Sequence, residues 1–316
     1  MLSVCLENGA VSVRRQPVPR RPEGFALIRL LYGGICNTDL ELQRGYYGFR
    51  GTPGHEFIGE VVEADDRRWI GQRVAGEINL ACGKCEWCAR GLGRHCPKRT
   101  VLGIVKQPGA FREFLTLPER NLRRVPREIS SEEAVFVEPL AAACEILDQV
   151  RIPRGTPVAV LGDGKLGLLA SQVLQAHGAE VHQYGRHKEK LRIAEQAGVS
   201  TEIAKKLPVA KYEFVVEATG SSEGLRQAVQ MTQPRGTIVM KSTVHGLVSI
   251  DTAPVIVNEI TLVGSRCGRF EPALRLLRNK KVRVDGMISE VLPLRDAPRA
   301  FRAAAKKGVL KVLLHA

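Results

Sequence analysis

A glycine-rich turn halfway along the chain constrains the fold more than any other feature. The apolar run Pro157–Leu161 is typical of a short buried strand, and a helical segment follows the turn. Three glycines at this spacing allow a tight turn, a close approach of a pyrophosphate to the backbone, and close packing of helix on strand. The free N–H groups at the start of the helix favour phosphate. We therefore expect a dinucleotide-binding site formed by Gly162, Gly164, Lys165, Leu166 and Gly167.

Strands and helices alternate regularly after this turn. This alternation is typical of a doubly wound α/β sheet, in which ligands bind at the carboxyl ends of the strands. Helices are expected at Leu191–Gly198 and Ser221–Thr232. Further strands are expected at Glu180–Tyr184, Phe214–Ala218, Thr237–Lys241 and Ile260–Gly264, the last two as buried strands.

The end of the second strand bears on which dinucleotide binds. An NAD site favours Asp or Glu there, because the carboxylate accepts a hydrogen bond from the ribose 2′-hydroxyl. This chain has Gly185 instead, followed by Arg186. Without the carboxylate nothing repels a 2′-phosphate, and a guanidinium can bind that phosphate through two hydrogen bonds. We therefore predict NADP(H) over NAD(H); the alternative is a basic turn that only faces solvent, with mixed use of the two cofactors.

Four cysteines earlier in the chain have the spacing C-x2-C-x2-C-x7-C. Four thiolates this close on a loop can complete a tetrahedral shell with no open position, which is the arrangement of a structural zinc site. Such a lobe has little core of its own, so the metal supplies its folding energy. An iron–sulfur cluster is the competing use of four thiolates, but its common spacings differ. The ligands would be Cys82, Cys85, Cys88 and Cys96.

A second candidate metal site lies further upstream. Cys36, His55 and Glu56 offer a thiolate, an imidazole and a carboxylate, the ligand types of catalytic zinc sites that keep one position open. Asp39 is placed to orient the histidine from behind. Glu138 follows an apolar run, where a carboxylate is costly unless it is paired or binds metal. The alternatives are a buried cysteine, a core histidine and an exposed or salt-bridged glutamate.

The two ends of the chain have a different character from the middle. The first 125 residues are rich in strand-forming sequence, with a hairpin signal at Asn8-Gly9. Ser130 begins a helical stretch, continued over Ala134–Val150. From about Cys267 the pattern changes again. Helices are expected at Glu271–Lys280 and Ala297–Lys307, and strands at Ile288–Leu292 and Val309–Leu314.

The composition is that of a globular chain of about two domains. The chain has 316 residues, of which 44% are apolar and 25% charged. It has no apolar run of 18 residues and no secretory signal pattern, so we expect no membrane span and no export. Eight cysteines in such a chain favour metal binding over disulfides. We therefore expect a cytoplasmic location. The net charge of +14 is spread along the chain, which favours a solvated basic surface.

Together these residues resemble the zinc-dependent medium-chain alcohol dehydrogenase family over essentially the whole chain. The resemblance rests on Cys36 with Thr38-Asp39, on Gly54-His55-Glu56, on the four-cysteine lobe, on Glu138-Pro139-Leu140 and on the Gly162–Gly167 turn. It implies a GroES-like β-barrel catalytic domain over residues 1–139, with the zinc lobe at 80–97, and a Rossmann domain over 140–267. Residues 268–316 would return to the catalytic domain. Glu-Pro-Leu is similar to the polyol, sugar and threonine dehydrogenase branch.

The resemblance also implies roles for individual residues. Cys36 and His55 would hold a catalytic zinc, while Glu56 and Glu138 would compete for the remaining protein position or alternate in it. Thr38 matches the hydroxyl that accepts the substrate's proton. Lys190 matches a lysine that binds the adenosine ribose, and Thr219 lies where the family chain passes near the nicotinamide. Glu41 departs from the alcohol-active members, which often have a histidine there; this favours polyhydroxylated substrates.

The resulting expectation is a zinc-dependent oxidoreductase with two zinc ions per chain. It would move a hydride between an alcohol, preferably a polyol or sugar, and NADP(H). An NADPH-dependent aldehyde or ketone reductase and a threonine-type dehydrogenase that uses NAD remain alternatives. A nucleic-acid-binding zinc protein is a remote one, because the cysteine lobe lacks clustered basic and aromatic residues. The family usually forms homodimers or homotetramers, and no nucleic-acid or membrane partner is expected.

Overall fold

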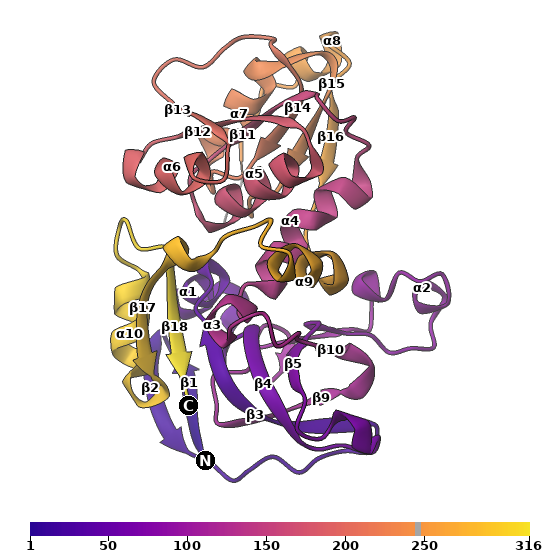
Figure 1. Ribbon diagram of the computed structural model, residues 1–316, viewed down its shortest axis with the longest axis vertical. Coiled ribbons are helices and arrows are strands. Elements are labelled where there is room, and N and C mark those ends of the chain that lie inside the picture. Colours follow the sequence, from indigo (N-terminus) through magenta and orange to yellow (C-terminus); the bar gives the residue numbers. More distant parts are fainter. Residues whose placement is uncertain (244–247) are drawn as a thin grey trace. The chain divides into compact units, whose positions relative to one another are not determined.

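The fold consists of two compact units, seen here in a computed structural model (Figure 1). The structure describes residues 1–243 and 248–316. The first unit combines Met1–Glu138 with Ile288–Ala316, so both chain ends belong to it. The second unit is the continuous segment Pro139–Met287. The chain therefore leaves the first unit, builds the second, and returns.

The first unit is built on a largely antiparallel sheet in the order β10-β5-β4-β3-β18-β17, with β9 also paired to β3. Only β17 and β18 run parallel to each other among these pairs. The sheet joins segments from both chain ends, because β18 pairs with β3. Its strands are β3 (Phe25–Gly34), β4 (Glu56–Glu63), β5 (Arg73–Gly76), β9 (Phe114–Pro118), β10 (Leu122–Arg124), β17 (Ile288–Pro293) and β18 (Lys311–His315).

A hairpin and a small sheet complete the strands of this unit. The predicted hairpin is present as β1 (Leu2–Glu7) and β2 (Ala10–Arg15). Its turn residues Asn8 and Gly9 have φ of 48° and 79°, the left-handed conformation that a two-residue hairpin turn requires. The small sheet contains β6 (Asn79–Leu80), β7 (Thr100–Leu102) and β8 (Lys106–Gln107).

The helices of the first unit are short. A capping box between Ser130 and Glu133 begins α3, as predicted. The predicted continuous helix Ala134–Val150 is interrupted by a turn after Ala134, and α4 begins at Val137. Pro139 explains the restart, because proline fits only the first turn of a helix. The helices are α1 (Asn37–Gln43), α2 (Glu86–Ala89), α3 (Ser131–Ala134) and α10 (Ala297–Ala304).

The second unit is a doubly wound α/β domain, as predicted. Its six strands are all parallel, in the order β13-β12-β11-β14-β15-β16. The order reverses at β11, which precedes the glycine-rich turn. The strands are β11 (Pro157–Leu161), β12 (Glu180–Gly185), β13 (Ser200–Ile203), β14 (Tyr212–Glu217), β15 (Thr232–Met240) and β16 (Thr261–Gly264). Helices α5, α6 and α7 pack against these strands. The helices of the unit are α4 (Val137–Gln149), α5 (Lys165–His177), α6 (Lys188–Glu195), α7 (Ser222–Met231), α8 (Ala253–Val257) and α9 (Phe270–Arg278).

Two features of this unit differ from the sequence-based expectations. Strand β16 was expected to be buried, but Thr261, Leu262 and Gly264 are exposed because β16 is the last strand of the sheet. The compact unit also extends to Met287, past the expected boundary at 267, because α9 packs within it. A Cβ atom on Gly268 would lie 1.8 Å from the Ala141 carbonyl oxygen, which shows how closely this segment packs on α4.

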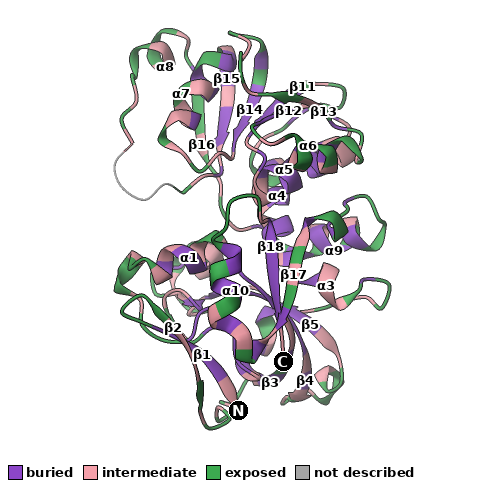
Figure 2. Ribbon diagram, turned by 90° about the vertical axis from the view of Figure 1, so that its left-hand side faces the viewer, coloured by how far each residue is buried: buried purple, intermediate pink, exposed green. Residues whose placement is uncertain are grey.

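Burial follows the strands of both sheets (Figure 2). In the first unit the buried strand β18 runs beside β3, and in the second the central strands β11 and β14 are almost fully buried. Among the described residues, no helix combines the length and apolar character needed to cross a bilayer.

Candidate active site and metal centres

Cys36, His55 and Glu56 come together inside the first unit. Their ligand atoms all lie within 4.8 Å of one another, and His55 and Glu56 are buried. Cys36 precedes α1, and Glu56 begins β4, where it pairs with Gly34 of β3. Gly54, with φ of 100°, turns the chain so that the next residue faces the cluster. The structure thus brings together three of the four residues that the sequence offered as ligands of a catalytic zinc.

Asp39 ties the cluster together. Its carboxylate accepts hydrogen bonds from the backbone N–H of Cys36 at 2.9 Å and of Gly54 at 3.1 Å. Its Oδ1 also lies 3.4 Å from Nδ1 of His55, and Asp39 is completely buried. The carboxylate therefore holds the helix start that carries Cys36 against the turn that carries His55. The sequence predicted that Asp39 orients the His55 ring, and that role stays a prediction.

A buried lysine, which sequence reasoning missed, completes the cluster. Lys311 lies on β18, and its ammonium group forms an ion pair with Glu56. Both side chains are 1% exposed. A Cβ atom on Gly34 would lie 2.9 Å from Glu56 Oε2, so the glycine leaves room for this pair. The signal was present in the sequence, because a lysine inside the apolar run Val309–Leu314 needs an anionic partner.

The surroundings of the cluster favour positive charge. Burial by itself lowers the pKa of His55, but Asp39 and Cys36 raise it well above the ordinary value. Burial likewise lowers the pKa of Lys311, and Glu56 and Cys36 raise it overall. Both groups are thus pushed toward their cationic forms in spite of burial. A site of this kind suits a metal cation.

Loss of the Lys311 ammonium is expected to destabilise the first unit. Lys311→Met leaves the Glu56 carboxylate buried without its cationic partner, which should lower the free energy of unfolding by about 3–5 kcal/mol. Lys307→Met is the matched control, because Lys307 is exposed. Denaturant unfolding of the metal-free protein measures both. Adding Glu56→Gln to Lys311→Met should recover part of the loss; equal stability of the Lys311 and Lys307 variants would contradict this account.

Two further residues predicted for this site, Thr38 and Glu138, are not part of the cluster itself. Thr38 is half-buried, and its Oγ1 lies 3.8 Å from Cys36 Sγ. Glu138 is half-buried in the first turn of α4, and its carboxylate is not among the atoms gathered within 4.8 Å. Glu41, the departure from the family pattern, forms an ion pair with Arg44 at 2.5 Å. Of the two glutamates, Glu56 thus belongs to the group gathered with Cys36 and His55, and Glu138 does not.

The four cysteines of the second candidate site also converge. Sulfur atoms lie 3.5 Å apart between Cys85 and Cys88, 3.6 Å between Cys85 and Cys96, and 3.9 Å between Cys82 and Cys88. Four sulfurs at about 2.3 Å from one zinc ion would be about 3.8 Å from each other in a tetrahedron. None of the four forms a disulfide. The lobe therefore has the geometry of a four-thiolate zinc site.

Backbone groups and neighbouring thiols set different pKa values within this lobe. A hydrogen bond from the backbone N–H of Lys84 lowers the pKa of Cys82 to about 6. At Cys85 the backbone N–H of Cys88 lowers the pKa, but burial and the neighbouring thiols raise it to about 11. Four thiolates side by side repel one another, so their joint ionisation needs a cation such as zinc.

The predicted dinucleotide turn lies between β11 and α5. Gly162 has φ of 112°, and a Cβ atom on it would lie 2.4 Å from the Ala218 carbonyl oxygen. A Cβ atom on Gly167 would lie 2.3 Å from the Gly162 carbonyl oxygen, so helix and turn touch at this point. Gln183, a residue that sequence reasoning missed, donates from Nε2 to this same carbonyl at 2.8 Å. Helix α5 then begins at Lys165 and directs its free N–H groups toward the turn.

The other predicted cofactor residues lie at the carboxyl ends of neighbouring strands. Gly185 ends β12, Arg186 is exposed, and Lys190 is half-buried on α6. Thr219 follows β14, where its N–H and its hydroxyl donate to the buried carboxylate of Glu217 at 2.8 and 2.6 Å. These ends share the edge of the sheet at which a doubly wound domain binds its ligand.

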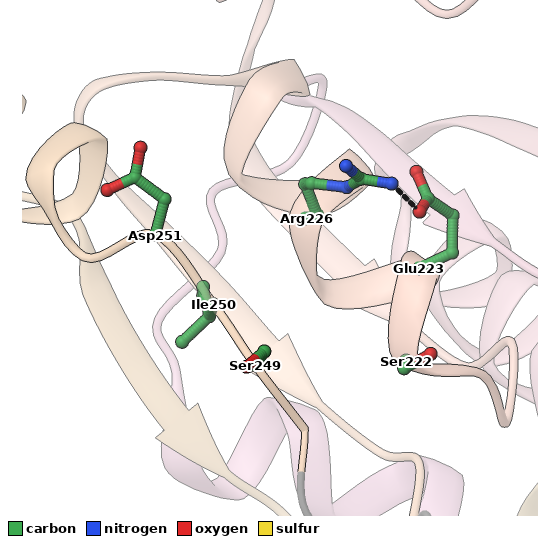
Figure 3. Close-up of a pocket in the computed structure, with 6 residues that line it drawn as sticks. All are labelled: Ser222, Glu223, Arg226, Ser249, Ile250 and Asp251. Atoms are coloured by element: carbon green, nitrogen blue, oxygen red, sulfur yellow. Dashed lines mark hydrogen bonds and ion pairs between the residues drawn. The ribbon is translucent and has the colours of Figure 1, made fainter.

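A hollow elsewhere in the second unit contains none of these residues. It has a volume of about 570 Å³ and is lined by residues of α7 and of the segment before α8 (Figure 3). Arg226 and Glu223 form an ion pair across one side of it. The lining residues are Ser222, Glu223, Arg226, Ser249, Ile250 and Asp251.

Comparison with known proteins decides the family. Residues 22–127 match the alcohol dehydrogenase GroES-like domain, and residues 166–279 match the zinc-binding dehydrogenase domain. An L-threonine 3-dehydrogenase of Chelativorans sp. is 30% identical over 96% of this chain and 94% of its own length. The chain belongs to the zinc-dependent medium-chain alcohol dehydrogenase family. This dehydrogenase is therefore an enzyme that acts on alcohol groups with zinc and a nicotinamide cofactor.

Two further relatives of this dehydrogenase cover nearly its whole length. A sorbitol dehydrogenase of Halalkalibacterium halodurans is 28% identical over 97% of this chain and 96% of its own. A zinc-binding dehydrogenase structure from Sinorhizobium meliloti, solved bound to NADP, has a TM-score of 0.91 and 29% identity. It covers 100% of this chain and 99% of its own chain. The family and fold inferred from the sequence are thus confirmed.

Proposed function

We propose that this dehydrogenase transfers a hydride between a polyol or sugar alcohol and NADP(H), at a catalytic zinc held by Cys36, His55 and a glutamate. The observation that carries the proposal is the buried cluster of Cys36, His55 and Glu56, with Asp39 and Lys311 around it. The carboxylates of Asp39 and Glu56 carry two negative charges, and the Cys36 thiolate that metal binding requires carries a third. Among these residues, only the Lys311 ammonium offsets them, which leaves an excess of two negative charges. A divalent cation would balance that excess.

Within the cluster, Glu56 is the better-supported third ligand. Its carboxylate lies beside Cys36 and His55, while its contact with Lys311 fixes its position. Glu138 remains the alternative or a ligand that alternates with Glu56. Comparison of bound zinc in Glu56→Gln and Glu138→Gln separates the two. The variant that loses its catalytic zinc identifies the direct ligand.

Individual residues of the chain would have separate roles in catalysis. When bound, zinc supplies a Lewis acid that lowers the pKa of an alcohol. Thr38, beside Cys36, would accept the proton of the substrate hydroxyl and pass it toward solvent. Asp39 would keep the His55 ring in one orientation. The turn from Gly162 to Gly167 would hold the pyrophosphate, so that the nicotinamide is positioned for hydride transfer.

The preference for NADP(H) is supported by the end of β12. Gly185 provides no carboxylate there, and Arg186 is exposed. The NADP-bound relative supports the same choice. Arg186→Gln is expected to raise the dissociation constant for NADP about tenfold or more, and to leave that for NAD within about twofold, because only NADP carries the 2′-phosphate. Fluorescence titration measures both constants; equal affinity of the wild type for NAD and NADP would contradict the preference.

Polyols and sugars are the proposed substrates. The sorbitol dehydrogenase relative supports this choice, as does Glu41 at the position where alcohol-active members often have histidine. Threonine is a second candidate, because of the relative at 30% identity. Hydride transfer measured on zinc-loaded protein across polyols, aldoses, threonine and simple alcohols decides between them. Turnover confined to threonine or simple alcohols would reject the polyol assignment, and turnover only with aldehydes or ketones would favour the reductase.

Three further parts of the proposal concern the whole molecule. We place a second, structural zinc in the four-cysteine lobe, which gives two zinc ions per chain. Strand β16, with Leu262 exposed at the sheet edge, offers a surface for a homodimer or homotetramer. The cysteines form no disulfides with one another, which supports a reducing compartment such as the cytoplasm.

A further inference from the structure

We propose that Asp163, inside the glycine-rich turn, is a specificity-determining residue with two effects. It holds the turn that carries Arg186, so that the guanidinium can bind a 2′-phosphate, and it leaves no room for a carboxylate side chain at position 185. The proposal rests on the NADP preference proposed above. Asp163 occupies a position that the glycine pattern leaves undefined, so the motif itself assigns it no role.

The carboxylate of Asp163 binds the turn that carries Arg186. Its Oδ2 accepts hydrogen bonds from the backbone N–H groups of Arg186 and His187, both at 2.6 Å. Nδ1 of His187 lies 3.0 Å from the same oxygen and 3.2 Å from Oδ1. Hydrogen bonds to an ionised carboxylate are about twice as strong as neutral ones. The backbone that sets the direction of the Arg186 side chain is therefore held by the cofactor turn itself.

A second contact joins the same two segments. Gln183, two residues before Gly185, donates to the Gly162 carbonyl, and its Oε1 accepts from Ser171 Oγ at 2.7 Å. Gln183 and Ser171 are fully buried. The end of β12 is thus attached to the glycine-rich turn through its strand and through the loop that follows. The pyrophosphate site and the ribose site would move as one unit.

The space beside Gly185 is filled by Asp163. A Cβ atom on Gly185 would lie 2.7 Å from both Cβ and Oδ2 of Asp163, and 2.8 Å from Leu191 Cδ2. The Cβ of Asp163 is close to the main chain and cannot move away cheaply. An acidic side chain at position 185, which an NAD site favours, would collide with Asp163 and repel its charge. The presence of Asp163 therefore requires glycine at position 185.

Asp163 does not itself replace the missing ribose ligand. It is 8% exposed, and its carboxylate is already engaged by the three donors of the Arg186–His187 turn. Arg186, in contrast, is exposed, and it has no ion pair within residues 1–243 and 248–316. The charged group offered to the cofactor is thus the guanidinium, and the carboxylate acts behind it as a positioning group.

Binding of NADP and NAD to four proteins tests this inference: the wild type, Asp163→Asn, Arg186→Gln, and the double variant. Asp163→Asn should raise the dissociation constant for NADP about tenfold and that for NAD no more than about twofold. In the Arg186→Gln background, Asp163→Asn should not raise the dissociation constant for NADP any further. Glu189→Gln is the matched control, because Glu189 is an exposed acid at the start of α6 and should leave both constants unchanged.

The outcomes separate this inference from the cofactor preference on which it rests. A wild type without preference for NADP rejects the preference itself. With that preference intact, unchanged NADP binding in Asp163→Asn overturns the role of Asp163. So does an equal loss for NADP and NAD, which would indicate only a damaged turn. Tighter NADP binding in both Asp163→Asn and Glu189→Gln would also overturn it, because the carboxylate would then act only through its charge.

A second pair of variants keeps the inference testable if Asp163→Asn folds poorly. Gly185→Asp alone should weaken binding of both cofactors and lower the melting temperature, because the new side chain meets Asp163. Combined with Asp163→Gly, it should regain stability and bind NAD more tightly than NADP. An NAD-preferring, fully stable protein from Gly185→Asp alone would overturn the exclusion.

Discussion

Cys36→Ser is expected to lower kcat by about 10³-fold or more while the protein remains folded. The catalytic metal contributes several kcal/mol of stabilisation to the developing charge, and each 1.4 kcal/mol corresponds to a factor of ten. Serine is a much poorer zinc ligand than a thiolate, so one of the two proposed zinc ions should be lost. Turnover and bound zinc measured on the same preparation check this result.

The matched control for this change is Cys5→Ser. Cys5 is a buried cysteine on β1, in the same unit but outside both cysteine-containing clusters. It should keep two zinc ions and near-normal turnover. Near-normal turnover of the Cys36 variant, with or without its zinc, would reject the catalytic assignment of the cluster.

Cys85→Ser is expected to act on stability first. The sulfur of Cys85 lies within 3.6 Å of those of both Cys88 and Cys96, so its loss opens the proposed four-thiolate shell. Structural zinc contributes about 10–16 kcal/mol to the folding of small zinc peptides, and losing one of four ligands should remove several kcal/mol. For a unit of this size the melting temperature should fall by about 10 °C.

The control for the lobe is Glu86→Gln, an exposed residue at the start of α2 that belongs to neither metal cluster. Its melting temperature should match that of the wild type. Scanning calorimetry with zinc and with a chelator resolves the effect. A Cys85 variant that melts like the wild type in both conditions would argue against a structural metal in the lobe.

The features that local sequence determines were predictable. Asn8-Gly9 specifies a two-residue turn, Ser130 and Glu133 specify a helix start, and the glycines from Gly162 to Gly167 specify a strand–turn–helix. In each case the chemistry lies within a few neighbouring residues. The pattern of Cys36, His55 and Glu56 could also be recognised as one of candidate zinc ligands, because the residue types and their order along the chain match those of the family.

Contacts between distant residues were not predictable in the same way. Lys311 and Glu56 are 255 positions apart, and they meet because β3 pairs with β18 on one side and with β4, which carries Glu56, on the other. Asp163 was just a variable position of a glycine motif until the fold placed it beside Arg186 and His187. The exposure of β16 depends on its place in the sheet order, which its own four residues do not encode.

The most direct test of the account follows turnover and bound zinc together while a chelator removes the metal. The wild-type protein, given a polyol and NADP, is expected to start with two zinc ions per chain. Turnover should fall in proportion to the occupancy of one of them and return when zinc is restored. Full turnover after both zinc ions are removed would contradict the account, as would no turnover on any alcohol or carbonyl compound with both zinc ions bound.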